Sequence, residues 1–164
     1  MSRELLLQNM YALYSQMITA NGFEFDWGYN ETWENGTSIK VDTPKFTVSF
    51  GYEDNDDRQN GLGNNEYQNR LPVEVRFGKT MTAPSDSKSA VDSMREELLA
   101  KMIRDIKRAF GNPYKITMPD FYCGVEYSGE INMNEDNMHL DPYTVIGGLE
   151  FVVTYRESRG IDEW

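Results

Sequence analysis

The stretch RLPVEVRFGKTMTAPSDSKSAVDSMREELLAKMIRDIKRAFG, residues 70–111, joins an alternating strand pattern to the longest helical pattern of the chain. Its first part alternates apolar and polar residues, which is typical of a half-buried strand. The apolar positions there are Leu71, Val73, Val75 and Phe77. After a polar linker at 80–88, apolar residues recur with the period of an amphipathic helix at Met94, Leu98, Met102, Ile106 and Phe110. This combination predicts a helix that lies across a sheet.

The ends of this helix carry the usual signals. Asp86 and Asp92 lie toward its positive N-terminal end, and Gly111 followed by Pro113 provides a stop. We expect the apolar stripe to pack on the sheet face that carries Phe151 of the last strand.

Length and charge favour one domain made in the cytoplasm. The chain has 164 residues and a net charge of −11, from 16 basic and 27 acidic residues. This length suffices for one hydrophobic core without disulfides or metal, so we expect a single domain over residues 1–164. The negative charge disfavours nonspecific binding to nucleic acid or to an anionic membrane. The first residues contain neither a signal-peptide core nor a membrane span.

Residues suited to catalysis are scarce. Cys123 is the only cysteine and His139 the only histidine, so a Cys/His nucleophile pair would need both. Cys123 falls in a strand pattern, where a small buried residue is the usual role, and His139 falls in a polar loop. The sequence also lacks a glycine-rich phosphate loop and paired thiols. We therefore expect no enzyme activity, no cofactor and no bound metal.

The other segments complete a pattern of two helices and about five strands. Residues 4–20 carry a helical stripe, and aromatic residues alternate with polar ones over 23–29 as in a strand. The turn signal Asn35-Gly36 allows a hairpin between that strand and residues 39–41. Further strand patterns cover 46–52, 121–131 and 149–155. The order α-β-β-β-α-β-β predicts an α+β fold, with a mixed or antiparallel sheet covered on one face by two helices.

Residues 53–69 are polar and contain glycine, which predicts a long hairpin loop. The acidic residues of this loop are Glu53, Asp54, Asp56 and Asp57. They invite a calcium interpretation, but the residues that follow break the alternating ligand order of an EF-hand, so solvated charge is the simpler interpretation. A second polar loop at 132–142 resembles a cation site only loosely.

Four residues mark apolar surface that the predicted core does not need. Proline cannot donate to a strand ladder, so Pro72 predicts a sheet edge or the start of a strand. Val152 lies on the second face of the last strand. Ile161 and Trp164 fall within 158–164, which predicts an exposed tail whose apolar side chains need a partner surface. These four residues are the candidate subunit interface, in two different patches: the exposed edge near Pro72, and the second face of the last strand with the tail residues.

The element order and three phrases of the sequence resemble the tail terminator, or tail completion, proteins of long-tailed bacteriophages. The phrases are QNRLPVEVRF at 68–77, DIKRAFG at 105–111 and GGLEFVVTYRE at 147–157. The resemblance covers residues 4–157. It implies a small α/β fold that assembles into a hexameric ring at the head-proximal end of the tail tube. Such a ring halts tube growth, presents a surface to the neck and has no catalytic residues.

The resemblance also implies partners and a location. The partners are further copies of this chain, the tail tube protein, the head-tail connector or neck protein, and genomic DNA that passes through the channel without specific binding. The location is the tail–neck junction of the virion. Repulsion between acidic side chains and DNA keeps DNA sliding, so Glu53, Asp54, Asp56 and Asp57 are the candidate assembly or channel loop.

Two alternatives stay open. One is a head-completion or neck adaptor subunit. The other is a small α+β ligand-binding module or enzyme, which would need a pocket with convergent polar groups.

Overall fold

The computed structural model describes residues 3–29, 43–55, 66–81, 88–111, 123–132 and 143–158. Its elements in chain order are α1 (Arg3–Tyr14), the 3-10 helix η1 (Thr19–Asn21), β1 (Gly28–Tyr29), β2 (Lys45–Phe50), β3 (Asp54–Asn55), β4 (Glu66–Thr80), α2 (Lys88–Phe110), β5 (Cys123–Glu130) and β6 (Thr144–Ser158). The fold is α+β, and its helices and main strands follow the predicted order.

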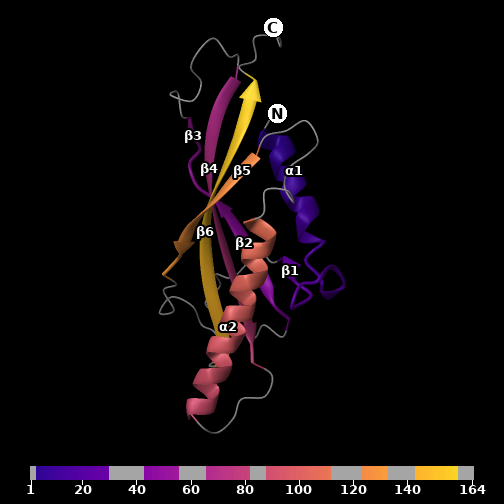
Figure 1. The fold of residues 1–164 in the computed structure, drawn as a ribbon, viewed down its shortest axis with the longest axis vertical. Helices are drawn as coiled ribbons and strands as arrows, with labels where there is room; N and C mark the ends of the chain where they lie inside the picture. Colours follow the sequence, from indigo (N-terminus) through magenta and orange to yellow (C-terminus); the bar gives the residue numbers. More distant parts are fainter. Residues whose placement is uncertain are drawn as a thin grey trace, which may run out of the picture.

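The sheet is mixed and is built around two 15-residue strands, β4 and β6. The strand order is β1-β2-β4-β6-β5, and β3 pairs with β4 beyond the end of β2. β1 and β2 are parallel, whereas the other pairs are antiparallel. β4 and β6 pair along their whole length, from Glu66 opposite Ser158 to Thr80 opposite Thr144. Figure 1 shows these two strands running along the long axis of the molecule.

The hydrophobic core lies between one face of the sheet and the two helices. The alternating residues of β4, namely Leu71, Val73, Val75 and Phe77, are all fully buried. On α2, Met102 and Ile106 are fully buried and Leu98 is half-buried. The ring of Phe110 stacks on that of Phe151 in β6, with centroids 6.1 Å apart. The predicted packing of α2 on the face that carries Phe151 is confirmed.

The C-terminal ends of the two helices meet over β2. The ring of Tyr14, the last residue of α1, lies 5.8 Å from that of Phe110, the last residue of α2. Both rings pack on Phe46 of β2, at centroid distances of 5.1 Å and 5.9 Å. In Figure 1 α1 descends and α2 ascends toward this meeting point. Tilted and edge-to-face rings of this kind are the favourable arrangements for aromatic pairs.

The N-terminal helix is shorter than the predicted 4–20. It ends at Tyr14, after which the Gln16 N–H donates to the Leu13 carbonyl and the Met17 N–H to the Tyr14 carbonyl. η1 follows and is capped by Gly22, whose φ of 87° lies in the left-handed region that glycine adopts readily. Met17 is still fully buried. The apolar residues predicted to face the core therefore do so here, although the helix ends before them.

The aromatic segment 23–29 is a strand only over β1. The N–H groups of Glu24 and Phe25 donate to the carboxylate of Asp105 on α2, at distances down to 3.0 Å and 3.3 Å, respectively. The N–H of Trp27 donates to the carbonyl of Met17 at 2.9 Å. These N–H groups therefore bind partners outside the sheet. Residues 39–41, the other half of the predicted hairpin, lie outside the described residues, and β1 pairs with β2.

The predicted loop at 53–69 is shorter at both ends. β3 takes up Asp54–Asn55, and β4 begins at Glu66. The two segments extend the sheet because Asp54 pairs with Arg70 and Asn55 with Asn69. Residues 56–65 lie outside the described part of the chain, as do residues 159–164 of the predicted tail.

Candidate assembly surface

The sheet face opposite the helices carries the alternate side chains of five strands. We call it the outer sheet face. Its half-buried and exposed side chains are Lys45, Thr47, Ser49, Asp54, Gln68, Arg70, Pro72, Glu74, Arg76, Glu126, Glu150, Val152, Thr154 and Arg156. None of these residues belongs to the hydrophobic core.

Pro72 and Val152 lie directly opposite each other near the centre of the outer sheet face. The structure thus places in one patch two residues that the sequence assigned to two different patches. The prediction that Pro72 marks a sheet edge is wrong, because β4 pairs with β6 on one side and with β2 and β3 on the other. Ile161 and Trp164 lie outside the described residues.

A β-bulge explains how a central strand accepts a proline. Pairing of β2 with β4 ends at Phe50, and pairing of β3 with β4 begins at Asp54 after a shift of one residue in the register. The Pro72 carbonyl accepts a hydrogen bond from the Gly51 N–H at 2.9 Å. The N and O atoms of a strand residue point to the same side, so the Pro72 nitrogen also faces this bulge. A missing N–H is tolerated there because the ladder is already interrupted.

Charge on the outer sheet face is balanced. Its acidic residues are Asp54, Glu74, Glu126 and Glu150, and its basic residues are Lys45, Arg70, Arg76 and Arg156. Arg76 and Glu74 form an ion pair at 3.0 Å. An apolar centre within a polar surround is the usual composition of a protein–protein interface. The net charge of −11 is carried elsewhere on the chain.

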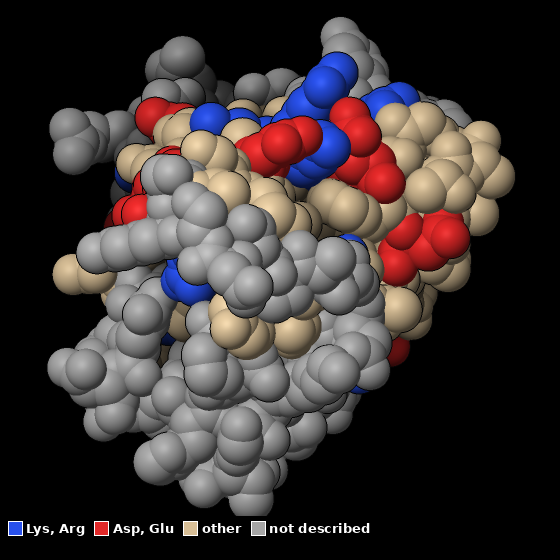
Figure 2. All heavy atoms as spheres, turned by 90° about the horizontal axis from the view of Figure 1, so that it is seen from below, with Lys and Arg blue, Asp and Glu red and all other residues tan. Residues whose placement is uncertain are grey.

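The exposed side of α2 is also mixed in charge. Lys101 pairs with Glu97 at 3.1 Å, and Arg104 pairs with Glu24 at 3.3 Å. Figure 2 views the molecule from the end at which α2 begins, and acidic and basic side chains intermingle along its upper side. The described residues in this view form no single-sign patch of the kind that steers nucleic acid.

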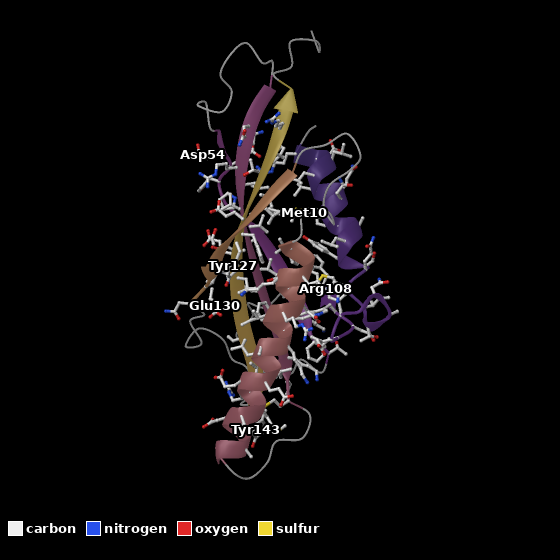
Figure 3. All side chains as sticks on the ribbon, viewed as in Figure 1. Met10, Asp54, Arg108, Tyr127, Glu130 and Tyr143 are labelled. Atoms are coloured by element: carbon white, nitrogen blue, oxygen red, sulfur yellow. The ribbon has the colours of Figure 1, made fainter. Side chains whose placement is uncertain are left out.

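The first two residues of the predicted channel loop lie at the end of the sheet. Glu53 accepts a hydrogen bond from the hydroxyl of the fully buried Tyr155. Asp54 lies in β3 opposite Arg70, and opposite charges in directly facing positions favour strand pairing. Figure 3 shows Asp54 toward the other end of the sheet from Tyr143. Asp56 and Asp57 lie outside the described residues.

Asp105 is a buried carboxylate that the sequence analysis did not single out. It is 2% exposed, and its Oδ2 accepts a hydrogen bond from the indole Nε1–H of Trp27 at 2.8 Å. The backbone N–H groups of Glu24 and Phe25 donate to the same carboxylate. In the sequence, Asp105 is an acid next to Ile106 on the core-facing side of the predicted helix. A charge buried at such a position needs several hydrogen-bond donors.

Arg108 adds a second link between α2 and the chain that follows α1. Its guanidinium donates to the carbonyl oxygens of Gly22 and Asn21, and it lies 5.1 Å from the centre of the Phe23 ring. Figure 3 shows Arg108 directed from α2 toward this segment. Asp105 and Arg108 together hold the segment between η1 and β1 against α2, which is a structural task.

Two surface hollows lie beside α2. One, of about 190 Å³, is lined by Phe25, Lys79, Met81, Met94, Glu97, Leu98 and Lys101. The other, of about 380 Å³, is lined by Leu99, Ile103, Glu130, Ile131, Asn132, Ile146, Gly147 and Gly148. The acid of the first hollow, Glu97, is already paired with Lys101. The second hollow combines apolar side chains of α2 with Glu130, Asn132 and strand backbone.

Within the described ranges, no group of three or more His, Cys, Asp or Glu side chains is placed to hold a metal ion. No helix in the part of the chain that the structure describes is long and apolar enough to cross a membrane. No family model matches the chain, and a search of curated proteins finds no significant match. A functional proposal therefore rests on the outer sheet face and on the sequence resemblance.

Proposed function

We propose that this protein is a tail terminator: a structural subunit that forms a ring at the head-proximal end of a phage tail tube, ends tube polymerisation and joins the tail to the neck. The observation that carries the proposal is the outer sheet face, where Pro72 and Val152 present an apolar centre within a charge-balanced surround. The resemblance of residues 68–77, 105–111 and 147–157 supplies the class of assembly.

The proposed ring needs two different patches on each subunit, because a head-to-tail contact repeats around a closed rotation. The outer sheet face is one of them. Its apolar pair is small and central, and the charged side chains around the pair set the orientation of the partner. We expect weak association in solution, since a terminator that closed freely would lose its dependence on a finished tube.

Genomic DNA is the proposed passenger of the ring rather than a bound ligand. A chain with a net charge of −11 repels the phosphate backbone and offers no specific affinity for it. The proposed location is the tail–neck junction of the virion, after synthesis in the host cytoplasm. Further copies of the chain, the tail tube protein and the connector or neck protein are the proposed partners.

Deleting the gene from its phage and imaging the tails tests this proposal. Overlong or unjoined tubes are expected, and normal-length tails joined to filled heads would contradict the terminator role. A pull-down with purified tail tube and connector separates the related role of a neck adaptor. A terminator is retained by the tube, whereas an adaptor is retained by the connector alone.

A further inference from the structure

The larger hollow is a groove beside the N-terminal part of β6, which extends beyond the last residue of β5. It has a volume of about 380 Å³, within the range of pockets that hold small organic groups. Leu99 and Ile103 of α2 form one wall, and Glu130, Ile131, Asn132 and residues 146–148 line the sheet side. Figure 3 shows Glu130 at the end of β5, on the opposite side of α2 from Arg108.

The groove lies beside a stretch of the β6 edge that no described strand covers. β5 pairs with β6 over Leu149 to Tyr155, and the Ile131 N–H donates one more bond to the Gly148 carbonyl at 2.9 Å. From Thr144 to Ile146, β6 has no strand partner on this side among the residues that the structure describes. A groove with an apolar wall next to such an edge suits an incoming extended peptide, whose backbone pairs with the edge while one side chain packs on Leu99 and Ile103.

We propose that this groove receives Trp164 from a second copy of the chain. Residues 159–164, RGIDEW, contain two apolar side chains, Ile161 and Trp164, and tryptophan brings the larger apolar surface. This inference rests on the proposed function, in which copies of the chain bind one another in a ring. It identifies the second patch that such a ring requires, separate from the outer sheet face.

Trp164 cannot reach the groove of its own chain. Gly147 in the groove lies eleven residues before Ser158, where β6 ends. At about 3.3 Å per residue, the strand carries the chain about 36 Å away from the groove. The six residues from Ser158 to Trp164 span at most about 22 Å when fully extended. The contact therefore joins two copies, and it is heterologous because tail and groove are different surfaces.

Photo-crosslinking identifies the neighbour of residue 164 directly. Benzoylphenylalanine replaces Trp164 in the full chain, and equal amounts of ¹⁵N-labelled and unlabelled copies are mixed at the highest soluble concentration. Mass spectrometry is expected to find peptides that join position 164 to 99–103 or to 146–148, with one partner labelled and the other not. Crosslinks confined to one copy, crosslinks to another surface, or no crosslinks between copies overturn the proposal.

Self-association measured by sedimentation equilibrium tests the energetics. Trp164→Ala should weaken association at least tenfold, as truncation of a central tryptophan does in other interfaces, and Trp164→Phe should retain most of it. On the groove side, Leu99→Ala should weaken association. Leu98→Ala is its matched control, because Leu98 is the neighbouring half-buried leucine and lines the other hollow. The proposal is overturned if the Trp164→Ala protein associates as tightly as the wild-type protein. It is also overturned if the wild-type protein does not associate.

This inference and the proposed function fail separately. Normal joined tails from the deleted phage would refute the terminator role and leave the crosslink standing. Overlong tails together with no crosslink to the groove would refute the groove contact alone.

Discussion

The indole Nε1–H of Trp27 donates a 2.8 Å hydrogen bond to the carboxylate of Asp105, 78 residues further along the chain. Asp105 is 2% exposed, and the backbone N–H groups of Glu24 and Phe25 bind the same carboxylate. One side chain of α2 thus fixes the path of the chain between η1 and β1.

Asp105→Ala should lower the free energy of unfolding by about 2–4 kcal/mol, because it leaves three N–H donors without their acceptor. Urea unfolding followed by circular dichroism measures the change. Glu97→Ala on the same helix is the control, since its exposed ion pair with Lys101 should contribute less than ~0.5 kcal/mol. Equal stability of the Asp105→Ala protein and the control would contradict the structural role of the carboxylate.

The sequence predicted α2 and the inner face of β4 because both follow from local periodicity: Leu71 and Met102 recur in register with their neighbours and are buried. It did not predict the path of residues 23–27, whose N–H groups bind Asp105 and the Met17 carbonyl rather than a neighbouring strand. The central position of Pro72 was also missed, because it depends on a bulge in a different strand. These interactions join residues distant in sequence, so no local pattern contains them.

The candidate site was predictable in part for the same reason. Alternation along the last strand placed Val152 on the face away from the core, and the structure agrees. That Pro72 lies opposite Val152 depends on the register of β4 and β6, which the sequence left undetermined. The groove beside Ile146 depends on where β5 ends, and that too is a property of the assembled sheet.

Two buried tyrosines should respond oppositely to removal of their hydroxyl groups. The Tyr14 hydroxyl is buried and has no hydrogen-bond partner among the residues that the structure describes. This burial, with smaller effects of Tyr29 and Tyr11, raises the pKa of Tyr14 far above the ordinary value. Tyr14→Phe should therefore leave stability unchanged or raise it slightly. Tyr155→Phe should cost about 1–2 kcal/mol, because the Tyr155 hydroxyl donates to Glu53. Thermal unfolding of both variants checks this, and a larger loss from Tyr14→Phe would contradict it.

Gly147→Ala should destabilise the protein by about 1–3 kcal/mol, because the core has no room for another carbon. A Cβ at this position would lie 2.8 Å from the ring of Phe77 and 3.0 Å from Leu99. Gly28→Ala is the matched control, since its Cβ would meet nothing closer than 3.5 Å. Chemical unfolding of the two variants gives the comparison. Equal unfolding midpoints would contradict the expected clash of the new Cβ at position 147.

The pKa of Asp26 should lie below its ordinary value, because its carboxylate accepts hydrogen bonds from the backbone N–H and then from the hydroxyl of Thr19. A lowered pKa in the folded state means that this stabilisation is present above the ordinary pKa and is lost as pH falls through the lowered one. NMR titration measures the shift. Thr19→Ala should move the pKa of Asp26 only part of the way back to its ordinary value, because the backbone N–H still donates. An unchanged pKa in this variant would show that the Thr19 hydroxyl has no effect.

Complementation of the deleted phage tests the outer sheet face as an assembly surface most directly. Val152→Asp places a charge at the apolar centre opposite Pro72, whereas Ser93→Asp places the same charge at an exposed position on α2, outside that face. Tail lengths and head joining are measured by electron microscopy of lysates from each complemented phage. The account predicts overlong or unjoined tubes with Val152→Asp and normal, joined tails with wild type and Ser93→Asp. Normal-length tails joined to filled heads with Val152→Asp would contradict it.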